Sequence, residues 1–445
     1  MRAGISCHVI AQNRGASSGI EEPLQACGVA FNAIYVQDNH SIQNSGSTGI
    51  FLVILDDEID NQTLNLVLRS RQKNNALVIA IIDESNSLAL SRALALGFDD
   101  AIFQPIVSDL LRHRLEFYHN QIVSNGEYAL RSHVLTEFRQ EPVGETSKRP
   151  LADPDNGKVL LVGPACTLHV QLSGILGANR FVYASNVDAV QGQLFNSNFR
   201  VVIFVHNGNE FELEEFKSKI ASLRLRLGFA TVLALQEPFG GINEVPAAQE
   251  FMDYFLLPLP PEFLRLRVGY WLRYAESRVH FRELADWLFF PYAVDPTLKT
   301  YNLAFASEYL KAKLSQNSKS MIGLIGIKFR GVAACNRQLG GAHFNRILAR
   351  VSDQIRDILR GDDLTAYLSN GAFVCVLEIE KLEQLEAIAG RIKSKLRAHL
   401  RTMDRPNVTL DVETRTLRAE NDGWSDIDLI IEAFEDQQLT SSMAS

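Results

Sequence analysis

The sequence predicts an α/β protein with two doubly wound parallel sheets, followed by a unit in which an antiparallel sheet packs against helices. Short runs rich in Val, Ile and Leu alternate twice with amphipathic stretches, which is typical of buried parallel strands separated by helices. The last part of the chain instead has strand patterns joined by a short turn. The length of 445 residues also fits about three domains of roughly 150 residues each.

The first unit covers residues 1–122. We expect its helices at amphipathic stretches such as Ser87–Leu96 and Ser108–Tyr118, and its strands at the apolar runs between them. These runs are Ile5–Ile10, Ala33–Val36, Ile50–Leu55, Ala76–Ile82 and Ala101–Phe103. Residues 123–156 hold several Pro and Gly residues among many charges, which predicts a linker, with or without a helical first part.

The same pattern repeats in residues 157–278. The last strand of each unit ends at a proline, Pro105 in the first and Pro258 in the second. The strands expected here are Val159–Val162, Phe181–Tyr183, Val201–Val205, Thr231–Leu235 and Tyr254–Leu257. Two copies of one fold are the most economical interpretation.

A long helical segment, Pro261–Leu288, follows, and residues 279–291 are expected to form a linker helix. Tyr274, Phe281 and Leu288 are seven residues apart, which fits a short coiled-coil stalk. A helix docked on its own domain explains the same spacing equally well, and both interpretations stay open.

The third unit, residues 292–445, predicts the order α-β-α-β-β-α-β. The expected helices are Ala304–Leu314, Phe344–Leu359 and Leu382–Arg401. The expected strands are Met321–Phe329, Asp363–Leu368, Phe373–Glu378 and Val408–Val412. This order places a mostly antiparallel sheet against helices.

The bulk composition is ordinary for a soluble globular protein, with 46% hydrophobic and 22% charged residues. A net charge of −8 argues against broad binding to nucleic acid or anionic membranes. We find no signal peptide and no run of about 18 apolar residues, so we expect no membrane insertion. The five scattered cysteines predict reduced thiols in a cytoplasmic protein: Cys7, Cys27, Cys166, Cys335 and Cys375.

Three motifs of the third unit stand in order: DPTLKTYNL at residues 295–303, KFRGVAACNRQLGG at 328–341 and SNGAF at 369–373. From Asp295 to about Glu435, this segment resembles the GGDEF domain of diguanylate cyclases, which has a nucleotide-cyclase-like fold. Each motif is weak alone, but the ordered set at these spacings is fairly specific.

The two upstream units resemble receiver domains, which have a flavodoxin-like five-stranded parallel sheet. The order receiver–receiver–GGDEF resembles PleD-type response regulators. With its eroded final domain, the chain is most similar to members of that type that bind cyclic di-GMP without making it.

The resemblance implies that cyclase chemistry is lost. In the family, carboxylates at the positions of Lys328 and Gly371 hold the catalytic metal ions, so no metal is expected here. The guanine-reading pair falls on Asn336 and Asn345, and the hairpin that names the family falls on Ser369, Asn370, Gly371, Ala372 and Phe373. Residual GTP binding or cyclase activity stays an alternative, because Lys328 and Arg330 could meet phosphates. A solvated or salt-bridged strand end is the plainer interpretation of both.

A second site is implied at Arg360 and Asp363. Arg360 lies nine residues before Ser369, and Asp363 lies three residues after Arg360. In the family, an Arg-x-x-Asp motif at this distance is the inhibitory site for cyclic di-GMP. A guanidinium can donate two hydrogen bonds to guanine O6 and N7, while a carboxylate can accept from N1–H and the 2-amino group. A third family residue falls on Arg391. The alternative is a surface ion pair between Arg360 and Asp363, which would contribute little.

In PleD-like proteins, basic residues of the second receiver contact the same ligand. By position these are Lys158 and Arg180. Lys158 stands where the family example has Arg, and a lysine ammonium cannot form the bidentate hydrogen bonds of a guanidinium.

Receiver phosphorylation needs an Asp after the third strand together with an acidic pair, a hydroxyl and a Lys. Asp56 is the candidate phosphoacceptor of the first unit, with Asp57 adjacent. The acidic pair falls on Ala11 and Gln12, and the Lys falls on Gln104. The alternative role of Asp56 is to cap the turn at the strand end.

We therefore expect a non-catalytic cyclic di-GMP effector, in which the ligand controls domain arrangement and partner recruitment. By resemblance, its partners are an adaptor and a protease substrate in cell-cycle-linked proteolysis at the cell pole, and it forms a homodimer through its receivers. A scaffold that acts without ligand is the further alternative.

Overall fold

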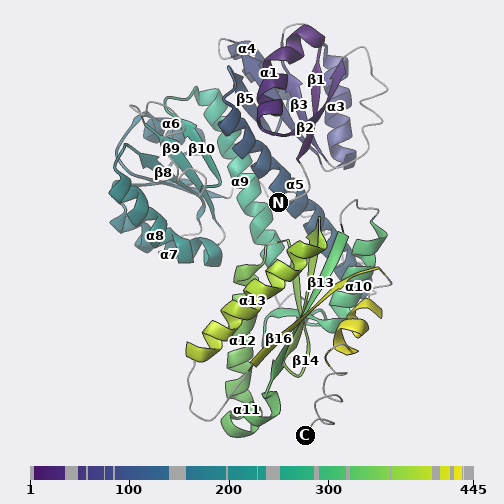
Figure 1. Ribbon diagram of the computed structural model, residues 1–445. Helices are drawn as coiled ribbons and strands as arrows, with labels where there is room; N and C mark the ends of the chain where they lie inside the picture. Colours follow the sequence, from purple (N-terminus) through teal and green to yellow (C-terminus); the bar gives the residue numbers. More distant parts are fainter. Residues whose placement is uncertain are drawn as a thin grey trace. The chain divides into compact units, whose positions relative to one another are not determined.

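The computed structural model describes residues 5–35, 49–56, 59–74, 76–83, 86–139, 157–196, 199–227, 229–236, 251–284, 290–316, 321–360, 362–402, 411–420, 425–432 and 434. The chain divides into two compact units (Figure 1). One consists of Gly4–Asn125 and Arg149–His280. The other consists of Met1–Ala3, Gly126–Lys148 and Phe281–Ser445.

The first sheet is entirely parallel, in the order β2-β1-β3-β4-β5. This is the flavodoxin-like order. Alternate residues of β3 enter different cores, because Leu52 belongs to one apolar cluster and Phe51 and Val53 to another. The strands are β1 (Ser6–Ala11), β2 (Ala30–Tyr35), β3 (Ile50–Ile54), β4 (Leu77–Asp83) and β5 (Asp100–Gln104); the helices are α1 (Arg14–Ala26), α3 (Asn61–Asn74), α4 (Ser87–Leu96) and α5 (Ser108–Arg139).

The second sheet repeats this order as β7-β6-β8-β9-β10, also with parallel pairing throughout. The prediction of two five-stranded parallel sheets is confirmed. The strands are β6 (Lys158–Val162), β7 (Phe181–Ala184), β8 (Phe199–His206), β9 (Ala230–Leu235) and β10 (Asp253–Leu256); the helices are α6 (Thr167–Leu176), α7 (Asp188–Asn196), α8 (Glu210–Leu227) and α9 (Pro261–Glu283).

The two long helices extend the sequence expectations. Helix α5 continues through residues 123–139, which agrees with the alternative that the first part of the expected linker is helical, and residues 140–156 lie outside the described part. In α9, Tyr270 and Tyr274 are buried, and their rings lie 5.4 and 4.6 Å from the ring of Phe117 on α5. This favours the docked helix over a free stalk for this part of α9. Leu288 and the side chain of Phe281 lie outside the described residues.

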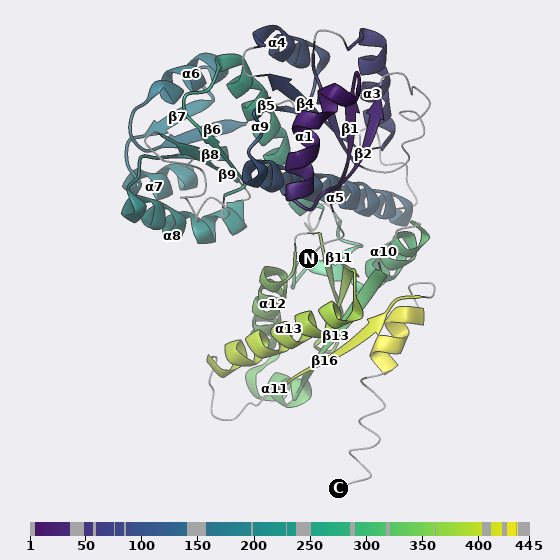
Figure 2. The same ribbon diagram turned by 45° about the horizontal axis from the view of Figure 1, so that its top comes forward.

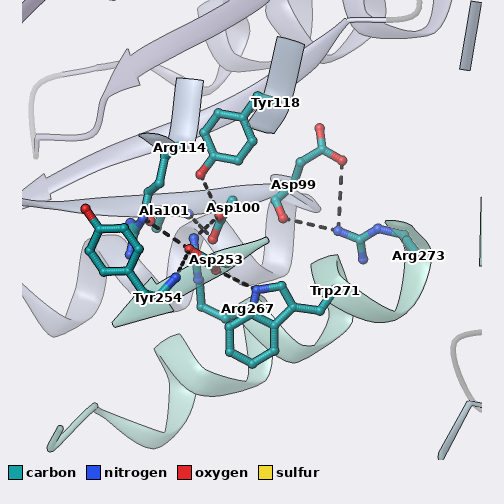
Figure 3. A network of polar contacts seen from close by, with 10 residues as sticks. All are labelled: Asp99, Asp100, Ala101, Arg114, Tyr118, Asp253, Tyr254, Arg267, Trp271 and Arg273. Carbon is teal, nitrogen blue, oxygen red and sulfur yellow. Dashed lines mark hydrogen bonds and ion pairs between the residues drawn. The ribbon is translucent and has the colours of Figure 1, made fainter. Parts of the chain in front are cut away.

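A buried ionic cluster joins the two sheets within their compact unit (Figure 3). Arg267 of α9 pairs with Asp100 at the start of β5 and with Asp253 at the start of β10. Arg114 of α5 lies 4.0 Å from Asp253. Asp100 also accepts from the Tyr118 hydroxyl at 2.5 Å, and Asp253 from the Trp271 indole at 2.6 Å.

The third sheet has the order β11-β12-β14-β15-β13-β16, and all its pairs are antiparallel except β12 with β14. Helices α12 and α13 lie together beside this sheet (Figure 2). The strands are β11 (Val294–Asp295), β12 (Thr300–Asn302), β13 (Met321–Arg330), β14 (Leu364–Ser369), β15 (Ala372–Ile379) and β16 (Asp411–Arg418); the helices are α10 (Leu303–Ser315), α11 (Val332–Leu339), α12 (Gly341–Ile358) and α13 (Leu382–Thr402).

Two differences from the expected third unit stand out. The short pair β11–β12 and helix α11 were not predicted. Strand β16 is described from Asp411 onward, and Val408, where the predicted last strand begins, lies outside the described residues. The second half of α5 belongs to this domain's core, because Leu130, Val134 and Leu135 pack in one cluster with residues of α10, β14 and β15. Among the described residues, no helix is long and apolar enough to cross a bilayer.

Candidate functional site: two turns at the ends of β14

The first turn leads from α12 into β14 and contains Arg360 and Asp363. The Asp363 carboxylate accepts a hydrogen bond from the backbone N–H of Arg360 at 2.8 Å, and the backbone N–H of Asp363 donates to the Arg360 carbonyl at 3.1 Å. The Arg360 side chain is exposed, and Gly361 lies outside the described residues. A side-chain ion pair between Arg360 and Asp363 is not among the ion pairs of the described chain. The turn is thus closed through the backbone of Arg360.

Asp363 is half-buried, and its surroundings disfavour the charged form. Burial, reinforced by the neighbouring carboxylate of Asp362, raises the pKa of Asp363 to about 7. The hydrogen bond from the backbone of Arg360 and the charges of Arg360 and Arg131 act in the opposite direction. The carboxylate therefore titrates near neutral pH, which matters for any ligand that must donate to it.

A buried cation supports this turn from behind. Arg131 of α5 donates through Nη2 to the Asp362 carbonyl at 2.8 Å and through Nε to Glu127 at 2.9 Å. Glu127 also accepts from Lys313 at 2.7 Å and from the Tyr309 hydroxyl. The sequence analysis missed this group, because Arg131 lies 231 positions from Asp362 and within the expected linker. The only local signal was the i, i+4 spacing of Glu127 and Arg131.

The other predicted ligand residues lie elsewhere. Arg391 is exposed on α13, in the same compact unit as the turn. Lys158 is half-buried at the start of β6, and the Arg180 Nε donates to the Gly157 carbonyl at 3.2 Å. Lys158 and Arg180 thus lie at the same end of paired strands β6 and β7, in the compact unit that does not contain Arg360.

The second turn joins β14 to β15 and consists of Asn370 and Gly371, since Ser369 pairs with Ala372. Both turn residues have positive φ, 46° and 74°, as the commonest two-residue hairpin turn requires. A Cβ on Gly371 would lie 2.8 Å from Val332 Cγ2, so glycine is needed for space as well as for conformation. Asn370 and Ser369 are exposed.

The rest of this hairpin serves packing. Phe373 is fully buried and contacts the rings of Tyr367 and Phe329, at 5.2 and 6.2 Å between centroids. The Gly371 N–H donates to the Tyr367 hydroxyl at 3.3 Å, and the Phe329 N–H donates to the Gly371 carbonyl at 3.1 Å. The five residues 369–373 contribute no carboxylate.

Beside this hairpin, Lys328 and Arg330 lie on β13. The Arg330 guanidinium pairs with Glu413 of β16 at 2.7 and 2.9 Å, which agrees with the interpretation as a salt-bridged strand end. The Lys328 ammonium lies 5.7 Å from the ring centroid of Phe434. Asn336 on α11 and Asn345 on α12 are both exposed. Within the described residues, no group of three or more His, Cys, Asp or Glu side chains could hold a metal ion.

In the first sheet, Asp56 follows β3. Its carboxylate accepts from the backbone N–H of Ile59 at 3.0 Å, a contact that fits the turn-capping alternative. At the corresponding end of β8 in the second sheet stands His206, which is buried. Asp57 lies outside the described residues.

Comparison with known proteins gives one family match. Residues 292–432 match the family described as "Diguanylate cyclase, GGDEF domain". No curated protein sequence matches the chain.

Solved structures that resemble part of the chain include the coiled coil and GGDEF domain of DgcB from Caulobacter crescentus in complex with c-di-GMP, at 12% identity over 36% of this chain and 88% of that chain, with a TM-score of 0.32. Diguanylate cyclase SiaD from Pseudomonas aeruginosa, solved with its activator SiaC, is 17% identical over 32% of this chain and 58% of that chain, with a TM-score of 0.27. The FimX GGDEF domain from the same organism is 15% identical over 32% of this chain and 92% of that chain, with a TM-score of 0.28.

Proposed function

We propose that the chain, whose residues 292–432 match the GGDEF family, is a non-catalytic effector that binds cyclic di-GMP at the turn of Arg360 and Asp363. The observation that carries this proposal is the geometry of the turn. The Asp363 carboxylate accepts a hydrogen bond from the backbone N–H of Arg360, which orders the turn while the Arg360 guanidinium remains exposed. An ordered turn reduces the conformational entropy that a ligand must overcome.

The two side chains offer complementary chemistry to guanine. The guanidinium of Arg360 donates to O6 and N7, and the carboxylate of Asp363 accepts from N1–H and the 2-amino group. A carboxylate has about four acceptor sites, so the hydrogen bond to Arg360 leaves capacity for the base. Arg391 on α13 is the third proposed ligand residue, and Lys158 and Arg180 are proposed to reach the ligand from the second sheet.

The hairpin supports the non-catalytic part of the proposal. Holding Mg²⁺ against a triphosphate requires carboxylates. Gly371 and Ala372 supply none, and Lys328 stands where the family has an Asp. The tight turn of Asn370 and Gly371 is organised by backbone conformation and by packing against Val332.

At the level of the whole chain, we propose a receiver–receiver–GGDEF response regulator similar to the non-catalytic effector PopA. Ligand would favour one arrangement of the domains by its higher affinity for that arrangement. The altered surface would recruit an adaptor and a protease substrate, in cell-cycle-linked proteolysis at the pole of the cell. The same proposal includes a cytoplasmic homodimer formed through the receivers and leaves Asp56 as the candidate phosphoacceptor.

Isothermal titration of the full chain with cyclic di-GMP tests the proposal. The wild type should bind at micromolar or lower Kd, and Arg360→Ala should lose at least about thirtyfold in affinity, or about 2 kcal/mol. Arg350→Ala is the matched control, because Arg350 is an exposed arginine within α12, outside the turn, and should leave binding unchanged.

Four other results would count against the proposal. Failure of the wild type to bind would remove the effector function. Formation of cyclic di-GMP from GTP and Mg²⁺ would favour the enzyme alternative, and binding of GTP lost in Lys328→Ala would favour a residual GTP pocket. Partner binding that ignores Arg360→Ala would favour the ligand-independent scaffold.

A further inference from the structure

Arg131 of α5 forms hydrogen bonds both to its own helix and to the turn that carries Asp363. Its side chain is only 4% exposed, and two of its hydrogen bonds diverge, with Nε on Glu127 of its own helix and Nη2 on the Asp362 carbonyl. The ring centroids of Tyr301 and Tyr309 each lie 5.6 Å from the guanidinium carbon, within range of a cation–π interaction. The planar guanidinium fork places its Nε and Nη2 donors in fixed and different directions that match these two acceptors, whereas an ammonium carries all its donors on one nitrogen.

Glu127 fixes the direction in which Arg131 points. This carboxylate accepts from Lys313 of α10 at 2.7 Å and from the Tyr309 hydroxyl, and Lys313 also pairs with Glu378 of β15 at 3.3 Å. Although burial acts to raise the pKa of Glu127, Arg131 and Lys313 hold it below its usual value. Both charges of the Glu127–Arg131 pair are thus compensated, as buried charges must be.

We infer that Arg131 is a positioning residue for the Arg360–Asp363 site and that the second half of α5 is a structural part of that site. The inference rests on the proposed function, because the turn matters as a site only if it binds a ligand. The hydrogen bond to the Asp362 carbonyl fixes the peptide immediately before Asp363. It therefore sets the direction of the carboxylate that must meet the guanine edge.

Arg131 also acts on Asp363 through its charge. The charged or titratable groups that face Asp363 are Arg360 and Asp362 of the turn, Arg131 of α5 and the buried thiol of Cys375 on β15. The positive charge of Arg131 favours the carboxylate form of Asp363. Loss of that charge should therefore move the titration of Asp363, and with it the pH dependence of binding, to higher pH.

Two substitutions separate the roles of geometry and charge. Arg131→Lys keeps the charge beside Glu127 but loses the fork, whereas Arg131→Gln loses the charge as well. Val134→Ala is the control, because Val134 is also buried on the same helix and packs in the apolar core of the domain. The assay is titration of each full-length variant with cyclic di-GMP between pH 6 and pH 8.5, with hydrogen exchange of the amides of residues 360 and 363.

We expect both Arg131 variants to bind about tenfold more weakly than the wild type, which corresponds to about 1.4 kcal/mol. Only Arg131→Gln should move the pH midpoint of binding upward. Both should speed exchange of the turn amides, whereas Val134→Ala should change neither affinity nor midpoint.

Wild-type binding combined with unchanged affinity, midpoint and exchange in the Arg131 variants would overturn the positioning role and leave the proposed function standing. A weakening of the same size in Val134→Ala would also overturn it, because general destabilisation would then explain the loss. Absence of binding by the wild type would instead overturn the proposed function, and the positioning role with it.

Discussion

Strand β14 has a turn at each end, and the two turns are built in different ways. The Arg360–Asp363 turn is held by side chains, through the Asp363 carboxylate and the buried Arg131 guanidinium. The Asn370–Gly371 turn is held by backbone conformation, with positive φ at both residues and no space for a Cβ at Gly371. A turn held by charged side chains therefore keeps polar groups available to a ligand. A turn held by backbone conformation can lose its polar side chains and still stay folded.

The largest effect on stability should come from the second turn. Gly371→Ala forces a side chain into positive φ and against Val332, so the free energy of unfolding should fall by about 3 kcal/mol. Urea denaturation measures the loss of stability. Under conditions where the variant is fully folded, its affinity for cyclic di-GMP should be unchanged. A drop in affinity would mean that the two turns are not independent. Asn370→Gly is the control, since glycine tolerates the same conformation.

At the first turn, the main effect should be on binding. Asp363→Asn keeps an oxygen that can cap the Arg360 backbone N–H, but it loses the negative charge. Affinity for cyclic di-GMP should fall by about 2 kcal/mol, roughly thirtyfold. The unfolding free energy at neutral pH should not fall, because the neutral Asn keeps the cap and avoids the cost of ionising Asp363 in the folded state. If this variant unfolds as easily as Gly371→Ala, the first turn is structural in the same sense as the second.

The pH dependence should follow from the raised pKa of Asp363. Because folding raises this pKa from 3.8 to about 7, the folded state binds the proton more tightly than the unfolded state. The contribution of Asp363 to stability is therefore present at low pH and is lost as pH rises from about 4 to about 7. Ligand affinity should change in the opposite direction, rising with pH as the carboxylate form appears. Asp363→Asn should remove both dependences, and retention of either would assign it to another group.

The smallest effect should come from the strand end beside the second turn. Arg330 is half-exposed and pairs with Glu413, so Arg330→Ala should lower the unfolding free energy by about 0.5 kcal/mol and leave cyclic di-GMP binding intact. Denaturation at 0.05 and 0.5 M salt measures this, because screening should shrink the difference. A loss of nucleotide binding in this variant would instead give the second turn a role in ligand contact.

Much of the fold could be predicted from the sequence, because local residue patterns determine the positions of the strands and of the hairpin turn. Apolar runs predicted every strand of the two parallel sheets, and an Asn-Gly pair between strand patterns is the strongest signal for a two-residue hairpin. The second half of α5 was obscured by Asn125-Gly126 and by charges, although Leu130, Val134 and Leu135 already marked an apolar face. Contact between Arg131 and Asp362 depends on how α5 packs on the third domain, which local periodicity does not encode.

Single residues show the same limit. Lys299 adopts φ 52° in a loop where Asp295 accepts from the backbone N–H groups of Thr297 and Leu298, and a lysine gives no sequence signal for that conformation. The pairing of Arg114 and Arg267 with acidic residues of the other sheet likewise required the packed structure.

That ionic cluster has one consequence for how the two parallel sheets associate. Asp100, Arg114 and Tyr118 stand at the same places in the first fold as Asp253, Arg267 and Trp271 in the second, and each arginine reaches the aspartate of the other fold. This is the reciprocal pattern of a two-fold dimer, but both halves belong to one polypeptide. Dilution cannot separate them, since their effective concentration is set by the connecting chain. A substitution also enters only one side of the pseudo-axis, and the two sides already differ, because Asp100 accepts from Tyr118 and Asp253 accepts from Trp271.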